Sequence, residues 1–475
     1  MNDSALIDII TGCARGCVIA PAGCGKTEQV ARAALHGEGR RLILTHTLAG
    51  VDALRARLKE KRADPGHYQI STIAAWSLRI ASAFPMRSGL FITMPKTNKE
   101  YEAVCAAAVN LIKSGCIDSV IKASYSGVFV DEYQDCIRVQ HELVCALSNL
   151  IPCCIFGDPL QSIFGFRDNS LPDWDREVLA TFLVVAELRR PWRWEQVGNI
   201  ALGKWLLRCR NELWETGQID LRSRPPTVHY RRLPGANDTQ YYGEKIRLVK
   251  EALGALKGEK CIIIGDSQNE LGRALLARNV TASAVEPVDC KRLTVFVEKL
   301  GKVQGQDRLN LVLDLVKGIM TAADVAKLKK AVKAVCKGTR RPNSIEAACV
   351  EISQSQGLRP ILHLLEEIPK QQKGWIYRRE LYSALCGALR GVIAGTHETL
   401  IDAVWDVQNR RRHAGRRFGN RNIGSTLLVK GLEFDHVIIV DVETLKRNDL
   451  YVALTRGSRS VTVISETCIL RPKNS

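Results

Sequence analysis

One short stretch near the N-terminus has the residue types and spacing that bind a chain of phosphates. It lies between an apolar run at 17–19 and a helical pattern at 28–35. Its two glycines let the backbone turn so that several N–H groups point at one anion, and the N-terminus of the following helix favours negative charge. In such a loop the lysine reaches the β- and γ-phosphates and the threonine hydroxyl binds Mg²⁺. The alternative is a glycine-rich turn that matches by chance. The stretch consists of Ala20, Pro21, Ala22, Gly23, Cys24, Gly25, Lys26 and Thr27.

A pair of carboxylates follows a second apolar run. Residues 128–130 are β-forming and apolar, and Asp131 and Glu132 come directly after them. At the end of a strand Asp131 can hold hydrated Mg²⁺, and Glu132 can orient and deprotonate an attacking water. Acidic pairs in this position also cap helices. The acidic pair follows the loop at 20–27 by about a hundred residues and comes after an apolar run, and this position favours the catalytic interpretation.

A third apolar run, 153–156, leads into a segment that mixes polar, aromatic and basic residues. Gln161 stands where an amide can sense the γ-phosphate. Phe164, Phe166 and Arg167 follow it and alternate aromatic with basic groups, as in platforms on which single-stranded bases stack. Without further information, core packing of the two phenylalanines is the more common arrangement.

Bulk composition narrows the class of protein. A chain of 475 residues predicts two to four domains. A net charge of +18 favours a polyanionic partner, most often nucleic acid, with a general solubility charge as the alternative. The 16 cysteines have no zinc-site spacing, and no apolar run approaches the length of a membrane span. Scattered thiols and the lack of a recognisable signal peptide predict a cytoplasmic protein.

Seven stretches together resemble the motifs of superfamily 1A helicases of the UvrD/Rep/PcrA type, in the family's order. The stretches similar to motifs I, Ia, II and III are 20–27, 45–47, 131–135 and 157–167, and those similar to motifs IV, V and VI are 188–193, 430–434 and 451–456.

The resemblance implies roles for individual residues, with ATP and Mg²⁺ as cofactors. Arg193 and Arg456 match the two arginines that reach the γ-phosphate from the family's second motor domain, where they stabilise the charge of the transferring phosphoryl group. Trp192 matches the aromatic residue that stacks on adenine, and Glu433 matches the carboxylate that binds the ribose. The positions that match the family's DNA contacts are Thr45, His46, Phe164, Phe166 and Arg167.

The implied fold is α/β, with two RecA-like P-loop NTPase domains, the second interrupted by a helical insertion. We expect residues 1–178 to form the first motor domain, with a small insertion at about 85–126. Residues 179–285 and 423–475 should form the second, and residues 286–422 the helical insertion.

The implied function is that of an ATP-dependent DNA translocase or helicase that acts on single-stranded or tailed duplex DNA, moving 3′ to 5′. The alternative is a DNA-activated ATPase that regulates a partner protein. Short proteins similar to this one occur beside OLD-family nucleases in Gabija-type antiphage systems, so antiviral defence and DNA repair both stay open.

Four departures from the family pattern bear on these roles. No clear glutamine motif, which reads adenine in the family, precedes Ala20, so the preference for ATP over other nucleotides is open. His46 replaces an aromatic residue, Pro191 replaces the usual asparagine, and 425–429 is unusually apolar.

Two further stretches give hypotheses of their own. Cys24 lies at a helix N-terminus, where the local field should lower the pKa of a thiol; an inert small residue is the alternative. Residues 410–421 hold six arginines and no acid. They suit contact with a nucleic-acid backbone, docking of an acidic partner, or a solvated loop.

Overall fold

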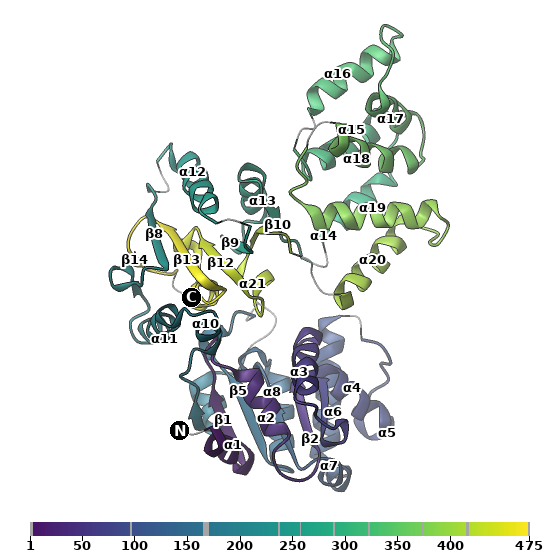
Figure 1. Ribbon diagram of the computed structural model, residues 1–475. Helices are drawn as coiled ribbons and strands as arrows, with labels where there is room; N and C mark the ends of the chain where they lie inside the picture. The colour runs from purple at the N-terminus through teal and green to yellow at the C-terminus, as the bar shows by residue number, and fades with distance from the viewer. Residues whose placement is uncertain are drawn as a thin grey trace. The chain divides into compact units, whose positions relative to one another are not determined.

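The computed structural model describes residues 3–95, 97–164, 171–235, 238–256, 258–287, 290–321, 324–371, 374–414 and 418–473. The chain divides into two compact units (Figure 1). The first contains residues 1–219, 446–459 and 474–475, and the second contains residues 220–445 and 460–473.

The first unit is built on a six-stranded sheet in the order β3-β2-β4-β5-β1-β6, with parallel pairing throughout. When both faces of a parallel sheet are covered, its strands consist almost entirely of apolar residues. Most strands of this sheet have that composition. Their bounds are β1 Arg15–Ile19, β2 Arg41–Thr45, β3 Tyr68–Thr72, β4 Gly127–Val130, β5 Cys153–Gly157 and β6 Leu183–Glu187.

Two apolar clusters cover the two faces of this sheet, and neighbouring residues of one strand belong to different clusters, as the alternation of side chains requires. One cluster holds Val18 and Phe129 with residues of the helices α1 Asp3–Gly12, α2 Lys26–Ala34 and α3 Leu48–Glu60. The other holds Cys17 and Val128 with residues of α4 Ile73–Ala83, α6 Asn98–Lys113, α7 Asp118–Ser124 and α8 Arg138–Ser148. The segment expected as a small insertion at 85–126 thus adds α6 and α7 to the core, with the short helix α5 Pro85–Ser88 before them.

The first compact unit extends past the expected boundary at residue 178. β6 pairs with β1 in the first sheet, and residues up to 219 belong to the first unit rather than to a second motor domain. Phe182, Ala186 and Leu188 are buried there, so leaving β6 out would expose apolar surface and the edge of β1. The same unit includes the helices α10 Trp192–Gln196, α11 Ile200–Glu215 and α22 Arg447–Leu454.

The second unit contains a second six-stranded sheet in the order β10-β11-β9-β12-β13-β8. Its pairings of β8 with β13, β9 with β11 and β12, and β10 with β11 are parallel. Two parallel six-stranded sheets are the α/β arrangement expected for two RecA-like domains. The bounds are β8 Val228–Arg232, β9 Cys261–Ile264, β10 Ser283–Ala284, β11 Arg421–Gly424, β12 Phe434–Ile439 and β13 Gly457–Ser465. The helix α12 Tyr241–Gly254 lies between β8 and β9 in the sequence, and α13 Glu270–Asn279 lies between β9 and β10.

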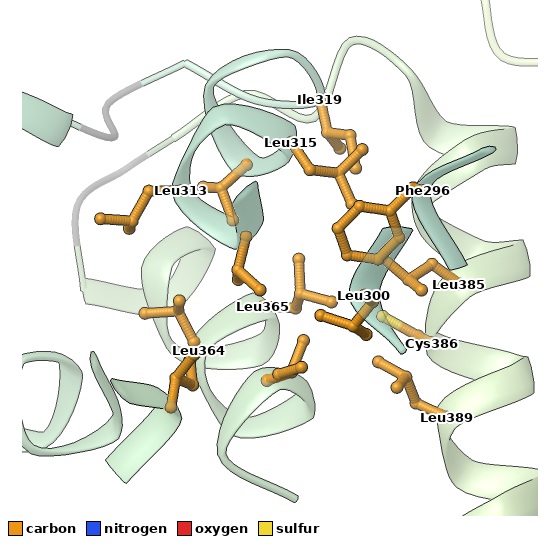
Figure 2. Close-up of a cluster of buried hydrophobic side chains, with 14 of the residues drawn as sticks. Phe296, Leu300, Leu313, Leu315, Ile319, Leu364, Leu365, Leu385, Cys386 and Leu389 are labelled. Atoms are coloured by element: carbon orange, nitrogen blue, oxygen red, sulfur yellow. The ribbon is translucent and has the colours of Figure 1, made fainter. Parts of the chain in front are cut away.

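A helical segment interrupts the second sheet between β10 and β11, as predicted. Its helices share one apolar core, in which Phe296, Leu300, Leu365 and Leu385 are buried (Figure 2). The arginine run expected at 410–421 overlaps the end of α20, where Arg410 pairs with Asp406 at 2.8 Å, and residues 415–417 lie outside the described part of the chain. The helices are α14 Lys291–Leu300, α15 Gly305–Lys317, α16 Val325–Cys336, α17 Ser344–Gln354, α18 Arg359–Gln371, α19 Arg379–Ile393 and α20 Leu400–Ala414.

Among the described residues, no single helix has the length and apolar composition that crossing a membrane needs. α6 and α7, bent by 100° where they meet, pass that test only when they are taken together.

Candidate active site

The predicted phosphate-binding loop, residues 20–27, joins β1 to α2 at the carboxyl edge of the first sheet. The Ala20 N–H donates to the Gly157 carbonyl at 2.8 Å, which fixes the loop beside the end of β5. Gly23 and Gly25 have φ of 71° and 84°, in the left-handed region that other residues rarely adopt. A methyl group on Gly23 would also lie 2.5 Å from the Trp194 ring. Both dihedral strain and close packing therefore require glycine at position 23.

Lys26, at the start of α2, lies between the two predicted carboxylates at the end of β4. Its Nζ is 3.0 Å from Asp131 Oδ1, and it also forms an ion pair with Glu132. Burial alone would lower the pKa of the Lys26 ammonium, but the two carboxylates outweigh burial and the pKa rises above its usual value. Burial raises the pKa of Asp131, and Lys26 opposes that rise. The structure thus brings the predicted lysine, metal ligand and general base together.

Glu132 has a backbone conformation that is uncommon for its residue type. Its φ of 55° and ψ of 41° place it in the left-handed region at the turn after β4. Gln134 Nε2 donates to Glu132 Oε2 at 2.5 Å, and Gln134 Oε1 accepts the Asp158 N–H at 3.1 Å. Strained residues of this kind cluster at functional sites, where the surrounding contacts hold them. Gln134 and Lys26 both contact the Glu132 carboxylate and so help to orient it.

Gln161 belongs to a buried polar network centred on Asp158, which sequence reasoning missed. Gln161 Nε2 donates to Asp158 Oδ2 at 3.2 Å. Arg210, on α11, donates to Asp158 Oδ1 through Nε at 3.1 Å and Nη2 at 3.0 Å. Asp158 is fully buried, so this charge needs such partners. The only sequence signal was an acid directly after a predicted strand, and nothing pointed to Arg210.

The helix α22 from the end of the chain contacts the phosphate-binding loop within the first unit. The Ala22 N–H donates to the Tyr451 hydroxyl at 3.2 Å. Asn448 Nδ2 donates to the Ser162 carbonyl at 2.8 Å and to the Pro159 carbonyl at 3.2 Å. Tyr451 lies in the predicted motif VI, but its contact with the loop and the role of Asn448 were not foreseen.

The two predicted arginine fingers both lie in the first unit, whereas we expected them to come from a second motor domain. The Arg193 N–H donates to the Gly23 carbonyl at 3.1 Å, and its Nη1 donates to the Thr455 carbonyl at 2.8 Å. Arg456 is buried, with Nε donating to the Val452 carbonyl at 2.9 Å. Arg193 therefore lies at the phosphate-binding loop, and the end of α22 lies beside Arg193.

The two residues predicted to hold the nucleoside part of the ligand lie in different units. Trp192 borders the phosphate-binding loop: a methyl group on Gly25 would lie 3.1 Å from Trp192 Cδ1. Glu433 lies in the second unit, directly before β12. The ribose-binding role of Glu433 stays a prediction.

The predicted DNA contacts are less well supported by the structure. Thr45 is buried, which does not favour direct contact with a strand, and His46 Nε2 lies 3.3 Å from Cys136 Sγ. Phe164 is 36% exposed, so the core alternative is wrong for this residue. Phe166 and Arg167 lie outside the described residues.

The residues present fit a nucleoside triphosphate with Mg²⁺. The two glycines with positive φ turn the backbone of the loop, and Lys26, Thr27 and two carboxylates lie at the same loop. Within the described ranges, no three His, Cys, Asp or Glu side chains form a metal cluster. The Asp131 carboxylate and the Thr27 hydroxyl are oxygen ligands that suit Mg²⁺, which proteins bind through few side chains together with phosphate oxygens.

The structure contradicts the hypothesis that the Cys24 thiol has a lowered pKa. Burial raises the pKa of its thiol to about 12, so burial outweighs the field of the helix N-terminus. We therefore expect Cys24 to react much more slowly with iodoacetamide at pH 8 than the exposed Cys116, because almost no Cys24 thiolate is present. Peptide mapping by mass spectrometry after timed labelling measures both rates in one sample. Equal labelling of Cys24 and Cys116 in the folded protein would contradict this expectation.

Comparison with known proteins gives one family match. Residues 96–172 match the UvrD/REP helicase N-terminal domain, a segment that contains Asp131, Glu132, Gln161 and Phe164. No curated protein matches the chain.

Two solved structures of an arterivirus helicase, nonstructural protein 10, are distantly similar to the chain. The complex with DNA has 10% identity and a TM-score of 0.36, over 96% of this chain and 62% of that one. The crystal structure described without DNA has 10% identity and a TM-score of 0.32, over 96% and 61%. The present chain thus spans about three fifths of the length of the helicase it matches. Likeness this distant says nothing about activity.

Proposed function

We propose that the chain is an ATP hydrolase coupled to movement along single-stranded or tailed duplex DNA, a helicase of the UvrD/Rep type. One observation supports this most. Lys26 of the phosphate-binding loop lies between Asp131 and Glu132, and both carboxylates belong to the segment that matches the UvrD/REP domain. A net charge of +18 suits a nucleic-acid partner.

The contacts of the site indicate what each side chain does during hydrolysis. Lys26 would exchange its carboxylate partners for phosphate oxygens, and Asp131 and Thr27 would then hold the metal. Glu132 orients the attacking water and accepts its proton, while Gln134 holds the carboxylate in place. Bound Mg²⁺ supplies charge that neutralises the phosphates. Arg193, held at Gly23 by its own backbone, stabilises charge that develops on the γ-phosphate.

A short segment of the first unit offers a route from nucleotide to DNA. Gln161 is bonded to Asp158, and Phe164 follows it by three residues with its ring partly exposed. Asn448 of α22 holds the carbonyl of Ser162 between them. A change at Gln161 on hydrolysis therefore reaches Phe164 through three residues of backbone. Stacking on bases needs no sequence readout, which suits a motor that crosses any sequence.

Strand separation tests the proposal. With ATP and Mg²⁺, we expect the protein to unwind a duplex with a 3′ single-stranded tail and not one with a 5′ tail, because the resembling family moves 3′ to 5′. The Glu132→Gln variant is the control for contaminating helicases. DNA-stimulated ATPase without unwinding of either substrate would favour the alternative, a DNA-activated ATPase that regulates a partner such as a nuclease. ATPase activity that no DNA stimulates would contradict both.

A further inference from the structure

Three residues beside the phosphate-binding loop form a tight turn. The Trp192 N–H donates to the Arg190 carbonyl at 2.9 Å across Pro191, whose φ of −81° and ψ of 64° are those of an inverse γ-turn. The proline ring restricts φ to this range, so replacing the usual asparagine of motif IV preorganises the turn. Gly203 makes room beneath it, since a methyl group there would lie 2.6 Å from Pro191 Cβ.

The turn places the Arg190 guanidinium on the indole of Trp192. Arg190 Cζ lies 3.4 Å from the centre of the ring, in the geometry of a cation–π contact. Arg190 Nε donates to Glu195 Oε2 at 2.7 Å, which holds the guanidinium in place. The Arg190 side chain is 59% exposed, so it lies between the indole and solvent. Arg190 thus covers one face of the indole.

The same ring borders the loop that we assign to phosphates, because Trp192 Cδ1 is the atom nearest to a methyl group placed on Gly25. A nucleotide held by its phosphates at that loop has its base within reach of the indole, where stacking is favourable. Base and guanidinium cannot both lie on one face of the ring.

We propose that Arg190 occupies the nucleobase subsite on Trp192, so that a base binds by displacing the guanidinium. Arg190 is then a specificity-determining residue that reduces the contribution of the base to nucleotide affinity. The inference rests on the proposed nucleotide site of the first unit, and it does not depend on DNA or on movement.

Calorimetric titration of the purified full chain with ATP and with inorganic tripolyphosphate, both with Mg²⁺, tests this. Arg190→Ala should bind ATP about two- to fivefold more tightly than Arg189→Ala does, the change expected from losing an exposed cation–π competitor. Arg189 is the matched control, because it is 82% exposed, pairs with Glu187 at 2.8 Å and carries the same charge one residue away. The two variants should bind tripolyphosphate equally, since that ligand has no base.

Two outcomes would overturn the inference: Arg190→Ala binding ATP no more tightly than Arg189→Ala, or the same gain for tripolyphosphate as for ATP. Lys26→Ala separates this failure from failure of the site itself. If Lys26→Ala binds ATP as tightly as the parent chain, the phosphate-binding loop is misassigned, and so is the proposed function.

Discussion

Replacing Glu132 with glutamine is expected to lower the rate of ATP hydrolysis by about 10²- to 10⁴-fold, the range that a positioned general base contributes. The substitution keeps the size of the side chain and its capacity to accept a hydrogen bond from Gln134. It removes only the ability to take a proton from water. Lys26 and Asp131 keep their contact, so ATP binding should persist. Single-turnover hydrolysis and titration with a fluorescent ATP analogue measure the two properties separately.

Glu28→Gln is the matched control for that experiment. Glu28 lies in the first turn of α2, where its carboxylate pairs with Arg32 at 2.7 Å and with Lys61 at 2.5 Å. Glu28 lies on α2, the helix that follows the loop, and Glu28→Gln removes the same charge as Glu132→Gln. Glu28 is not one of the acids that contact Lys26. We expect near-parental turnover for Glu28→Gln. A Glu132→Gln variant that hydrolyses ATP at the parental rate would show that another group is the base.

Replacing Lys26 with alanine should strongly lower the rate of hydrolysis and also weaken ATP binding. Removing one preorganised charge from such a site costs about 10²- to 10³-fold in rate. Here the loss extends to binding, because Asp131 and Glu132 would remain as two neighbouring carboxylates without the ammonium between them. Without the ammonium, the charge of these two carboxylates repels the phosphates with nothing to offset it.

The same titration and hydrolysis assays test Lys26→Ala, with Lys61→Ala as the control. Lys61 pairs with Glu28 outside the cluster of carboxylates, so its removal should change affinity little. Binding of ATP by Lys26→Ala with parental affinity would contradict the role of Lys26 at the phosphates.

The parts of the site that the sequence predicted are those set by local chemistry. The roles of the glycines, Lys26 and the paired carboxylates can be predicted from a few neighbouring residues. A phosphate-binding loop and a strand-end carboxylate are local structures. The α/β fold with a helical insertion followed from the same motifs in order.

The parts that escaped prediction depend on packing between distant segments. Arg210 lies 52 positions from its partner Asp158, and nothing in either local sequence specifies the pair. The boundary expected at 178 followed from assigning motif IV to a second domain, and local sequence did not indicate that β6 pairs with β1 in the first sheet. Cys24 was misjudged because a helix field can be read from the sequence, while burial of a thiol cannot.

The placement of α22 also has a consequence for biosynthesis. The ribosome makes the phosphate-binding loop first, then residues 220–445 of the other unit, and only then Tyr451, which accepts a hydrogen bond from Ala22. At 5–20 residues per second, the interval in which residues 220–445 are made lasts roughly 10–45 s. During it the nascent chain has Lys26, Asp131 and Glu132 but neither Tyr451 nor Arg456. Synthesis order therefore delays the contact between Tyr451 and the loop at 20–27 until residues 220–445 have been made.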